Sequence, residues 1–276
     1  ACVAWAGCIG GIIPPSIPMV IYGVSTSTSI SAMFLAGFAP GIIIGIVLCL
    51  VCYFYCKKQG WKGDDRKYTF KEKMKVVWDS KFALIEPVII LGGIYGGIFT
   101  PTEAAAVAAV YAFICGVFIF RELNFGNIYK TIAAACSTNG TTMVIIGCAT
   151  AFTRVLTIQQ IPAMITQAIL NFSTNKVVIL ILINILLLIV GCFMDTTPAM
   201  MVLSPILLPV ATSLGLSPIH FGIIMVVNLA IGFITPPLGI NLFVAARIGD
   251  VKLEVVCQGI IRFIIAMIVC LLAITF

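Results

Sequence analysis

Long apolar stretches are the feature that most restricts what this chain can fold into. Three of them, 30–56, 131–152 and 255–276, reach the roughly 20 predominantly apolar residues that a helix needs to cross a bilayer. Hydrophobic residues make up 61% of the chain and charged residues 9%, whereas soluble domains are about half apolar and about one-quarter charged. We therefore predict an all-α polytopic membrane protein. Its expected spans are 1–22, 30–56, 83–99, 102–120, 131–152, 220–246 and 254–276.

The basic residues indicate topology rather than a nucleic-acid partner, although the formal net charge is +6. Nine Lys and Arg residues lie in 57–81, two in 121–130 and two in 247–252. Basic residues near span ends mark the cytoplasmic side of a membrane protein. These three loops share that side only if 176–213 enters and leaves the membrane by the same face.

A re-entrant hairpin over 176–213 meets this condition, and two ordinary spans joined at Met194-Asp195-Thr196-Thr197 meet it equally well. Pro205 and Pro209 in the short second arm favour the hairpin, because proline removes a backbone donor from a helix. The preceding segment, 153–175, has apolar residues near helical spacing and suits a helix at the membrane interface.

Three sites share one sequence motif, in which a small or hydroxyl residue is followed by proline within an apolar stretch. Proline is tolerated at the start of a helix, and a preceding Thr or Ser can cap the free N–H groups, so each site predicts a helix that stops and restarts at membrane depth. Carbonyls freed there are ligands for a cation, and restarting N-termini favour an anion. The sites are Gly10-Gly11-Ile12-Ile13-Pro14-Pro15-Ser16, Met194-Asp195-Thr196-Thr197-Pro198 and Gly232-Phe233-Ile234-Thr235-Pro236-Pro237.

Asp195 is the leading candidate for ion coupling, because a carboxylate within a long apolar stretch is costly and marks an ion or proton path. The alternative is an Asp195 that lies at the aqueous surface. Thr100-Pro101-Thr102-Glu103 instead fits a capping box ahead of an Ala-rich helix, with Thr100 as the N-cap. An intramembrane aspartyl protease needs paired carboxylates, and Asp195, Glu86 and Glu103 occur in different settings, so we expect no enzyme.

The motifs together resemble the large membrane subunit of the tripartite ATP-independent periplasmic (TRAP) transporters, of the DctM/SiaM type. The resemblance covers the whole chain and implies that about the first third of the subunit is absent. The residues that carry it are Ile13-Pro14-Pro15-Ser16-Ile17-Pro18, the run from Gly92 to Ala104, Met194-Asp195-Thr196-Thr197-Pro198-Ala199, and the run from Asn228 to Phe243.

The resemblance implies an elevator-type transporter of two inverted repeats, each with a re-entrant hairpin and a broken helix. On this chain the end of the first repeat, with its broken helix, would be 1–29. A scaffold helix and basic cytoplasmic loop would occupy 30–81, further scaffold helices 82–152, and an interfacial arm helix 153–175. The second hairpin would be 176–213, its broken helix 214–246, and the last transmembrane helix 247–276.

The resemblance also implies the site. A sodium ion would be held by Gly191, Met194, Asp195, Thr196, Thr197, Gly232, Thr235 and Pro236. A partial first sodium site would contain Gly7, Gly10, Gly11 and Pro14. The candidates for substrate binding are Pro15, Ser16, Thr197, Pro237 and Asn241.

The expected function is therefore sodium-coupled uptake of an organic acid, such as a sialic acid or a C4-dicarboxylate, across a bacterial inner membrane. The resemblance implies a small membrane subunit and a periplasmic substrate-binding protein as partners, besides membrane lipid. A stand-alone sodium/anion symporter that needs no binding protein is the alternative.

Overall fold

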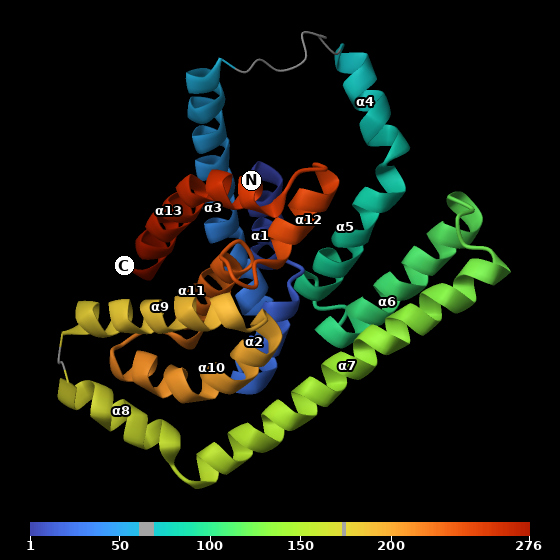
Figure 1. Cartoon of the computed structure of the whole chain (residues 1–276). Helices are drawn as coiled ribbons and strands as arrows, with labels where there is room; N and C mark the ends of the chain where they lie inside the picture. The colour runs from blue at the N-terminus through green and yellow to red at the C-terminus, as the bar shows by residue number, and fades with distance from the viewer. Residues whose placement is uncertain (61–68, 173–174) are drawn as a thin grey trace. The chain divides into compact units, whose positions relative to one another are not determined.

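The computed structural model describes residues 1–60, 69–172 and 175–276, and the regular elements in them are helices (Figure 1). Seven helical segments of these residues are long and apolar enough to cross a membrane, which confirms the all-α, multi-span prediction. The predicted spans 83–99 and 220–246 are not among the seven, which instead include Lys176–Phe193 and Thr196–Ser213. The helices are α1 Cys2–Ile12, α2 Ile17–Thr26, α3 Ile30–Gln59, α4 Phe70–Asp79, α5 Lys81–Tyr95, α6 Pro101–Ile114 with a π turn at Cys115–Ile119, α7 Phe125–Ile158, α8 Ile161–Phe172, α9 Lys176–Phe193, α10 Thr196–Ser213, α11 Pro218–Gly232, α12 Ile240–Ile248 and α13 Leu253–Thr275.

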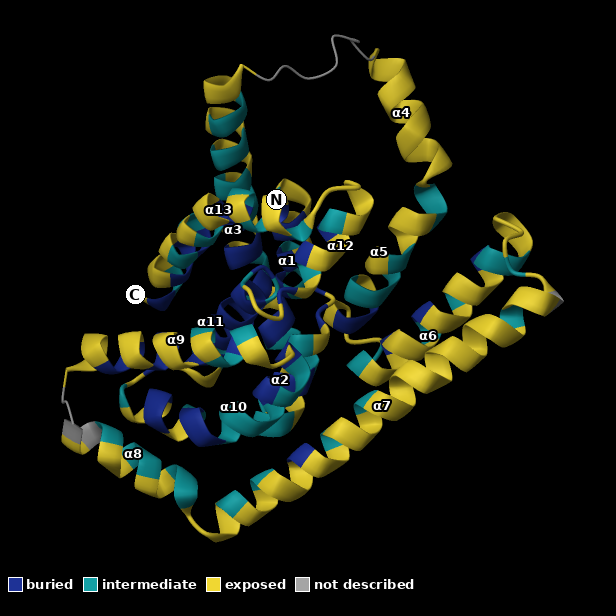
Figure 2. Cartoon of the chain, in the orientation of Figure 1, coloured by how far each residue is buried: buried dark blue, intermediate teal, exposed yellow. Residues whose placement is uncertain are grey.

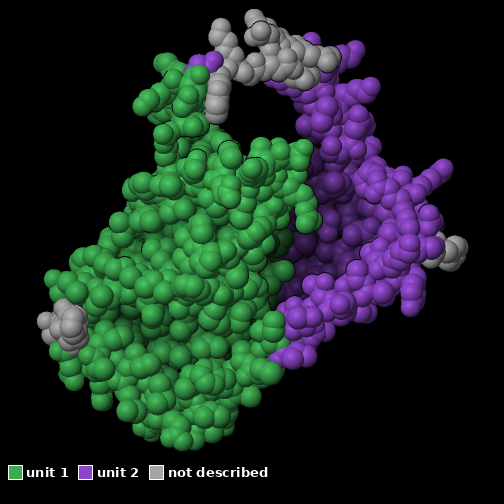
Figure 3. Space-filling model, viewed as in Figure 1, with its two compact units in different colours: residues 1–59, 145–276 green, residues 60–144 purple. Residues whose placement is uncertain are grey.

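Two compact units divide the chain, one of residues 1–59 and 145–276 and the other of residues 60–144 (Figure 3). Helix α11 is the centre of the first unit, since each residue from Phe221 to Gly232 is buried (Figure 2). Helices α1, α2, α3, α9, α10 and α13 pack against α11. Such burial on all sides is typical of an innermost helix.

Helix α3 packs in this first unit, on α1, α2, α11 and α13. Gly37 and Gly41 lie one turn apart on its buried face, and the side chains of Met19 and Ile13 fill the space that a Cβ would occupy there. Small residues on α3 thus let the first broken helix pack directly against it.

Helices α9 and α10 run in opposite directions and are joined at Met194 and Asp195 (Figure 1). Contrary to the expectation that prolines interrupt the second arm, α10 is continuous through Pro205 and Pro209. Pro205 cannot donate to the carbonyl of Met201, and Thr153 Oγ1 donates to that oxygen instead, at 3.3 Å. Both helices have 18 residues, about 27 Å at 1.5 Å per residue, so their length does not distinguish a re-entrant hairpin from two spans.

The predicted interfacial segment 153–175 begins later than expected. Helix α7 continues to Ile158, and α8 starts at Ile161 after a short turn. The hydroxyls of Thr138, Thr150 and Thr157 each donate to the carbonyl four residues earlier, so these polar residues remain helical. Residues 173–174 of the predicted segment lie outside the described residues.

The second unit contains α4, α5, α6 and the first part of α7. The capping box is confirmed, because Thr100 N donates to Glu103 Oε2 at 2.7 Å and Glu103 N donates to Thr100 Oγ1 at 3.3 Å. Tyr111 Oη donates to the carbonyl of Phe82 at 2.8 Å and joins α6 to α5. The predicted basic loop 57–81 includes α4, and its residues 61–68 lie outside the described chain.

Candidate functional site

The first break separates α1 from α2 at residues 13–16. Ser16 is the N-cap of α2, and its Oγ lies 3.5 Å from Met19 N. The same hydroxyl donates to the carbonyl of Gly11 at 2.5 Å. The Pro14–Pro15 peptide bond is cis. One buried serine therefore satisfies both the end of α1 and the start of α2, so the predicted stop and restart is confirmed here.

The second break separates α11 from α12 at residues 233–239. Thr235 Oγ1 donates back to the carbonyl of Ile231 at 2.8 Å, and the Pro236–Pro237 peptide bond is cis. The N-cap of α12 is Gly239, at a positive φ of 39°. The expectation that Thr235 caps the restarting helix is therefore wrong, because α12 starts only after a left-handed turn that favours glycine.

The hairpin tip joins α9 to α10. Met194 is extended, and Asp195 is the N-cap of α10, with Oδ1 accepting from Thr196 N at 2.8 Å. Asp195 is exposed, while Thr196 is buried. The carboxylate thus lies at the surface of the described chain, and it stabilises the positive end of α10.

The hairpin and the second break meet through backbone atoms. The backbones of Gly191 and Gly232 touch, so that a Cβ placed on Gly232 would overlap the carbonyl of Gly191. Leu238 N donates to the carbonyl of Cys192 at 3.2 Å. The structure therefore brings Gly191 to Gly232, while the hydrogen bond of Asp195 stays within the tip.

The helices next to the two breaks, α1 and α12, also contact each other. Asn241 Nδ2 donates to the carbonyl of Ala4 at 3.1 Å and lies 3.6 Å from Cys8 Sγ. Gly7 leaves the space that this amide fills, since a Cβ there would lie 2.8 Å from Nδ2. Asn241, a candidate for substrate binding, thus holds α12 to α1 with its amide.

The remaining predicted residues lie around these contacts. Gly11 faces Phe233, whose ring is 3.9 Å from the position of an added Cβ, whereas no atom of the described residues lies within 4 Å of a Cβ added to Gly10. Pro14 and Ser16 are buried, Thr197 is half-buried, and the exposed residues are Met194, Pro15, Pro236 and Pro237.

The polarity of the helix ends suits two kinds of ligand. Helices α9 and α11 both end near the contact of Gly191 with Gly232, and the carbonyls at helix C-termini carry partial negative charge. Thr235 gives its proton to Ile231, which leaves the lone pairs of its oxygen available to a cation. Helix α10 begins after the end of α9, and α12 begins after the end of α11. Helix N-termini attract an anion.

Two buried residues on α9 and α11, within two helical turns of Gly191 and Gly232, were not predicted from the sequence. Asn184 on α9 and Asn228 on α11 are buried, and Asn228 Nδ2 donates to Asn184 Oδ1 at 2.8 Å. The sequence could have pointed to them, because each is a single amide within an apolar run, and a buried amide needs a hydrogen-bond partner.

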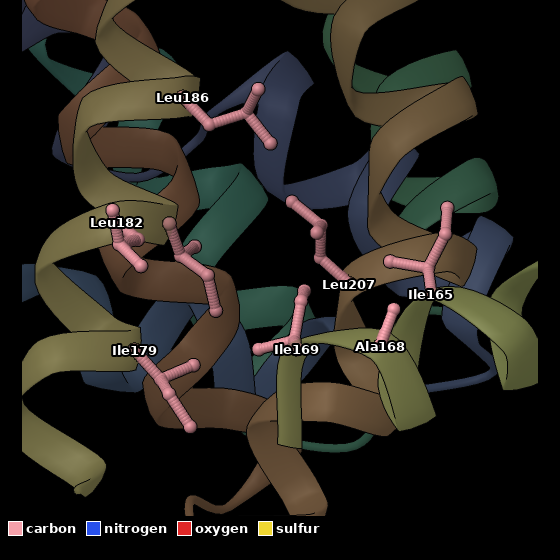
Figure 4. Close-up of a pocket in the computed structure, with 8 residues that line it drawn as sticks. Ile165, Ala168, Ile169, Ile179, Leu182, Leu186 and Leu207 are labelled. Atoms are coloured by element: carbon pink, nitrogen blue, oxygen red, sulfur yellow. The ribbon is translucent and has the colours of Figure 1, made fainter. Parts of the chain in front are cut away.

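An apolar cavity of about 420 Å³ lies between α8, α9 and α10 (Figure 4). Ile, Leu and Ala side chains line it, and they are Ile165, Ala168, Ile169, Ile179, Leu182, Ile183, Leu186 and Leu207. Such a lining offers no donor to a carboxylate, so this cavity is not a site for an organic acid.

Comparison of the sequence with known proteins finds a matching family and several relatives. The family model for the "Tripartite ATP-independent periplasmic transporter, DctM component" matches residues 1–276. The isethionate TRAP transporter permease protein DctMQ of Oleidesulfovibrio alaskensis is 49% identical over 276 residues, which are 100% of this chain and 44% of the relative.

Two further relatives are more distant in sequence. The sialic acid TRAP transporter large permease protein SiaM of Vibrio cholerae is 37% identical, over 96% of this chain and 62% of its own length. The C4-dicarboxylate TRAP transporter large permease protein DctM of Pseudomonas aeruginosa is 38% identical, over 98% of this chain and 63% of its own length. The chain thus spans about half to two-thirds of the length of these relatives.

Proposed function

Because the chain belongs to the DctM family of tripartite ATP-independent periplasmic transporters, we propose that it contributes a sodium site and part of an acid site to a permease for organic acids. The family is one of transporters, so an intramembrane protease is excluded. The observation that carries the proposal is the meeting of two helix C-termini, α9 and α11, at Gly191 and Gly232.

Sodium would bind at this meeting point. Carbonyl oxygens from the ends of both helices supply neutral hard ligands, and the Thr235 hydroxyl adds a further oxygen because its proton is already bound to Ile231. Asp195 would supply the negative charge from the hairpin tip, with Met194, Thr196, Thr197 and Pro236 completing the surrounding backbone. The residues Gly7, Gly10, Gly11 and Pro14 would contribute to a first sodium site of the whole subunit.

The substrate would be an organic anion that lies beside this ion. The N-termini of α10 and α12 attract negative charge. The candidates for binding the acid lie in the two breaks or in the first turns of α10 and α12, and they are Pro15, Ser16, Thr197, Pro237 and Asn241. The relatives are named for isethionate, sialic acid and C4-dicarboxylates. We place a small sulfonate such as isethionate first, since that relative is 49% identical over the whole chain.

Transport would follow an elevator mechanism in the bacterial inner membrane. The unit of residues 1–59 and 145–276 holds both breaks and the hairpin, so it would carry the ion and the acid. Helices α5 and α6 belong to the other unit and would be part of the scaffold. A small membrane subunit and a periplasmic binding protein would complete the transporter, and lipid would cover the exposed apolar faces of helices such as α3 and α7.

The test is uptake into proteoliposomes that contain the full-length subunit with its small partner subunit. Isethionate, sialic acid and a C4-dicarboxylate are supplied with and without sodium and the binding protein. We expect uptake of one acid that requires both. Uptake of free acid without the binding protein would favour the alternative, a stand-alone symporter. Uptake of the acid at the same rate with and without sodium would overturn the proposed coupling.

Thr235→Ala tests the ion site within the same assay. It should raise the half-saturating sodium concentration about ten- to hundredfold, because a hydroxyl bound to a charged group contributes about 1.5–3 kcal/mol. Thr212→Ala is the matched control. The Thr212 hydroxyl also donates to the carbonyl four residues earlier, at 3.0 Å, but Thr212 lies at the C-terminal end of α10, whereas the proposed site is at the N-terminal end. An equal sodium dependence in both variants would remove Thr235 from the site.

A further inference from the structure

A buried chain of polar groups joins α9, α11 and α13. Asn228 Nδ2 donates to Asn184 O at 3.1 Å and to Asn184 Oδ1 at 2.8 Å. Asn184 Nδ2 donates to Leu180 O at 2.9 Å and to Thr275 Oγ1 at 3.3 Å, and Thr275 Oγ1 donates to Leu271 O at 2.8 Å. Asn184, Asn228 and Thr275 are at most 3% exposed.

The orientation of both amides follows from their partners. The carbonyls of Leu180 and Asn184 can only accept, so an amino group must face each of them. Asn228 therefore turns its amino group to Asn184, and its Oδ1 is left buried without a partner among the described residues. An unpartnered buried oxygen is unfavourable, and the two bonds to Asn184 hold the side chain in place despite it.

The Asn184–Asn228 pair lies close to the helix ends that meet. Gly232 follows Asn228 by one turn of α11, and Gly191 follows Asn184 by two turns of α9. Both helices thus run from the amide pair toward the contact of Gly191 with Gly232. Two contacts at different heights fix the distance between the helices and their register along each other.

We propose that Asn184 and Asn228 are positioning residues that set the affinity of the sodium site, because their hydrogen bonds keep the carbonyl ends of α9 and α11 in register. This inference rests on the proposed function. Thr275 supports the pair from α13 through its bond to Asn184. None of the three residues touches the ion, and their effect on it is through the backbone of Gly191 and Gly232.

The experiment measures sodium-dependent uptake, and sodium-dependent thermal stability, of the full-length subunit in complex with its small partner subunit. Asn228→Leu keeps the number and branching of the side-chain heavy atoms and removes the amino group that donates both bonds to Asn184. We expect the half-saturating sodium concentration to rise about tenfold in both measurements, as for other changes that misplace ion ligands without removing them. Thr275→Val removes the bonds of Thr275 to Asn184 and to Leu271 but leaves the Asn184–Asn228 pair. It is the second variant, should Asn228→Leu fail to fold, and we expect a smaller rise.

His220→Ala is the matched control. His220 Nε2 lies 2.7 Å from the carbonyl of Ile274 and also joins α11 to α13, at the end of α11 remote from Gly232. This variant should lose stability while its sodium affinity stays that of the wild type. An unchanged sodium affinity in Asn228→Leu or, if that variant is unfolded, in Thr275→Val would overturn the inference. If the wild type itself shows no sodium dependence, the proposed function fails instead.

Discussion

The two helix breaks have similar sequences but satisfy their backbones differently. In the first break, Ser16 binds the carbonyl of Gly11 and caps α2, and it is 2% exposed. In the second break, the Thr235 hydroxyl donates back to the carbonyl of Ile231, and Pro236 and Pro237 are exposed. The first break is thus closed upon itself, whereas the second leaves oxygen lone pairs free beside the hairpin. A proline pair marks where a helix breaks, but the hydroxyl beside it decides whether the break can hold a ligand.

The largest expected effect is that of Gly232→Ala in the second break. The added Cβ would overlap the carbonyl of Gly191, so α9 and α11 must separate, at a cost of about 1–3 kcal/mol for overpacking. We expect uptake to be lost and the melting temperature to fall. Gly45→Ala is the control, because Gly45 on α3 has open space around it.

Gly10→Ala gives the corresponding change in the first break. Gly10 has no atom of the described chain within 4 Å of an added Cβ, so this variant should keep its melting temperature. If Gly10→Ala and Gly232→Ala are equally destabilising, the two breaks do not differ in packing as described.

Asp195 offers the next largest effect, since it combines a charge with a helix cap. Asparagine is as good an N-cap as aspartate, so Asp195→Asn removes the charge and keeps the cap. We expect sodium-dependent uptake to be lost in both Asp195→Asn and Asp195→Ala, with about 1 kcal/mol of stability lost only in the alanine variant. Wild-type uptake in Asp195→Asn would show that the carboxylate serves α10 alone.

Much of this arrangement was predictable from local sequence. Glycine and proline gave the positions of both breaks and of the hairpin tip, and Thr100 with Glu103 gave a capping box that the structure confirms. These features depend on residues within one turn of each other, where the backbone chemistry of proline, glycine and the N-cap residues dominates.

The rest depended on partners that are distant in the chain. Helix α10 passes through Pro205 because Thr153 on α7 binds the carbonyl that the proline frees. Thr235 does not cap α12, because seven residues separate the two helices and Leu238 is bound to Cys192 of the hairpin. The pairing of Asn184 with Asn228, 44 residues apart, is likewise a tertiary contact, although each amide alone was conspicuous in its apolar run.

A smaller effect, but one that sharpens the comparison, is the coupling of Thr197 to Thr235. If both residues surround one ion, Thr197→Ala and Thr235→Ala should each raise the half-saturating sodium concentration. The double variant should then deviate from the sum of the singles by about 0.5–3 kcal/mol. Ser16→Ala combined with Thr235→Ala provides the comparison, because the first break has a separate hydrogen-bond system, and these two should add within about 0.5 kcal/mol. Strict additivity of Thr197 and Thr235 would place the ion elsewhere.

The smallest expected effect concerns Ser16, whose hydroxyl closes the first break. Ser16→Ala removes the cap of α2 and the bond to Gly11, and loss of an N-cap costs about 0.5–2 kcal/mol, whereas glycine at the same position costs only about a few tenths of a kcal/mol. The free energy of unfolding, measured in mixed micelles, should therefore fall in the order wild type, Ser16→Gly, Ser16→Ala. Thr235→Ala should change this free energy little, because Thr235 caps no helix. If Thr235→Ala lowers the free energy of unfolding more than Ser16→Ala does, the hydroxyl of the second break is structural and the two breaks are alike.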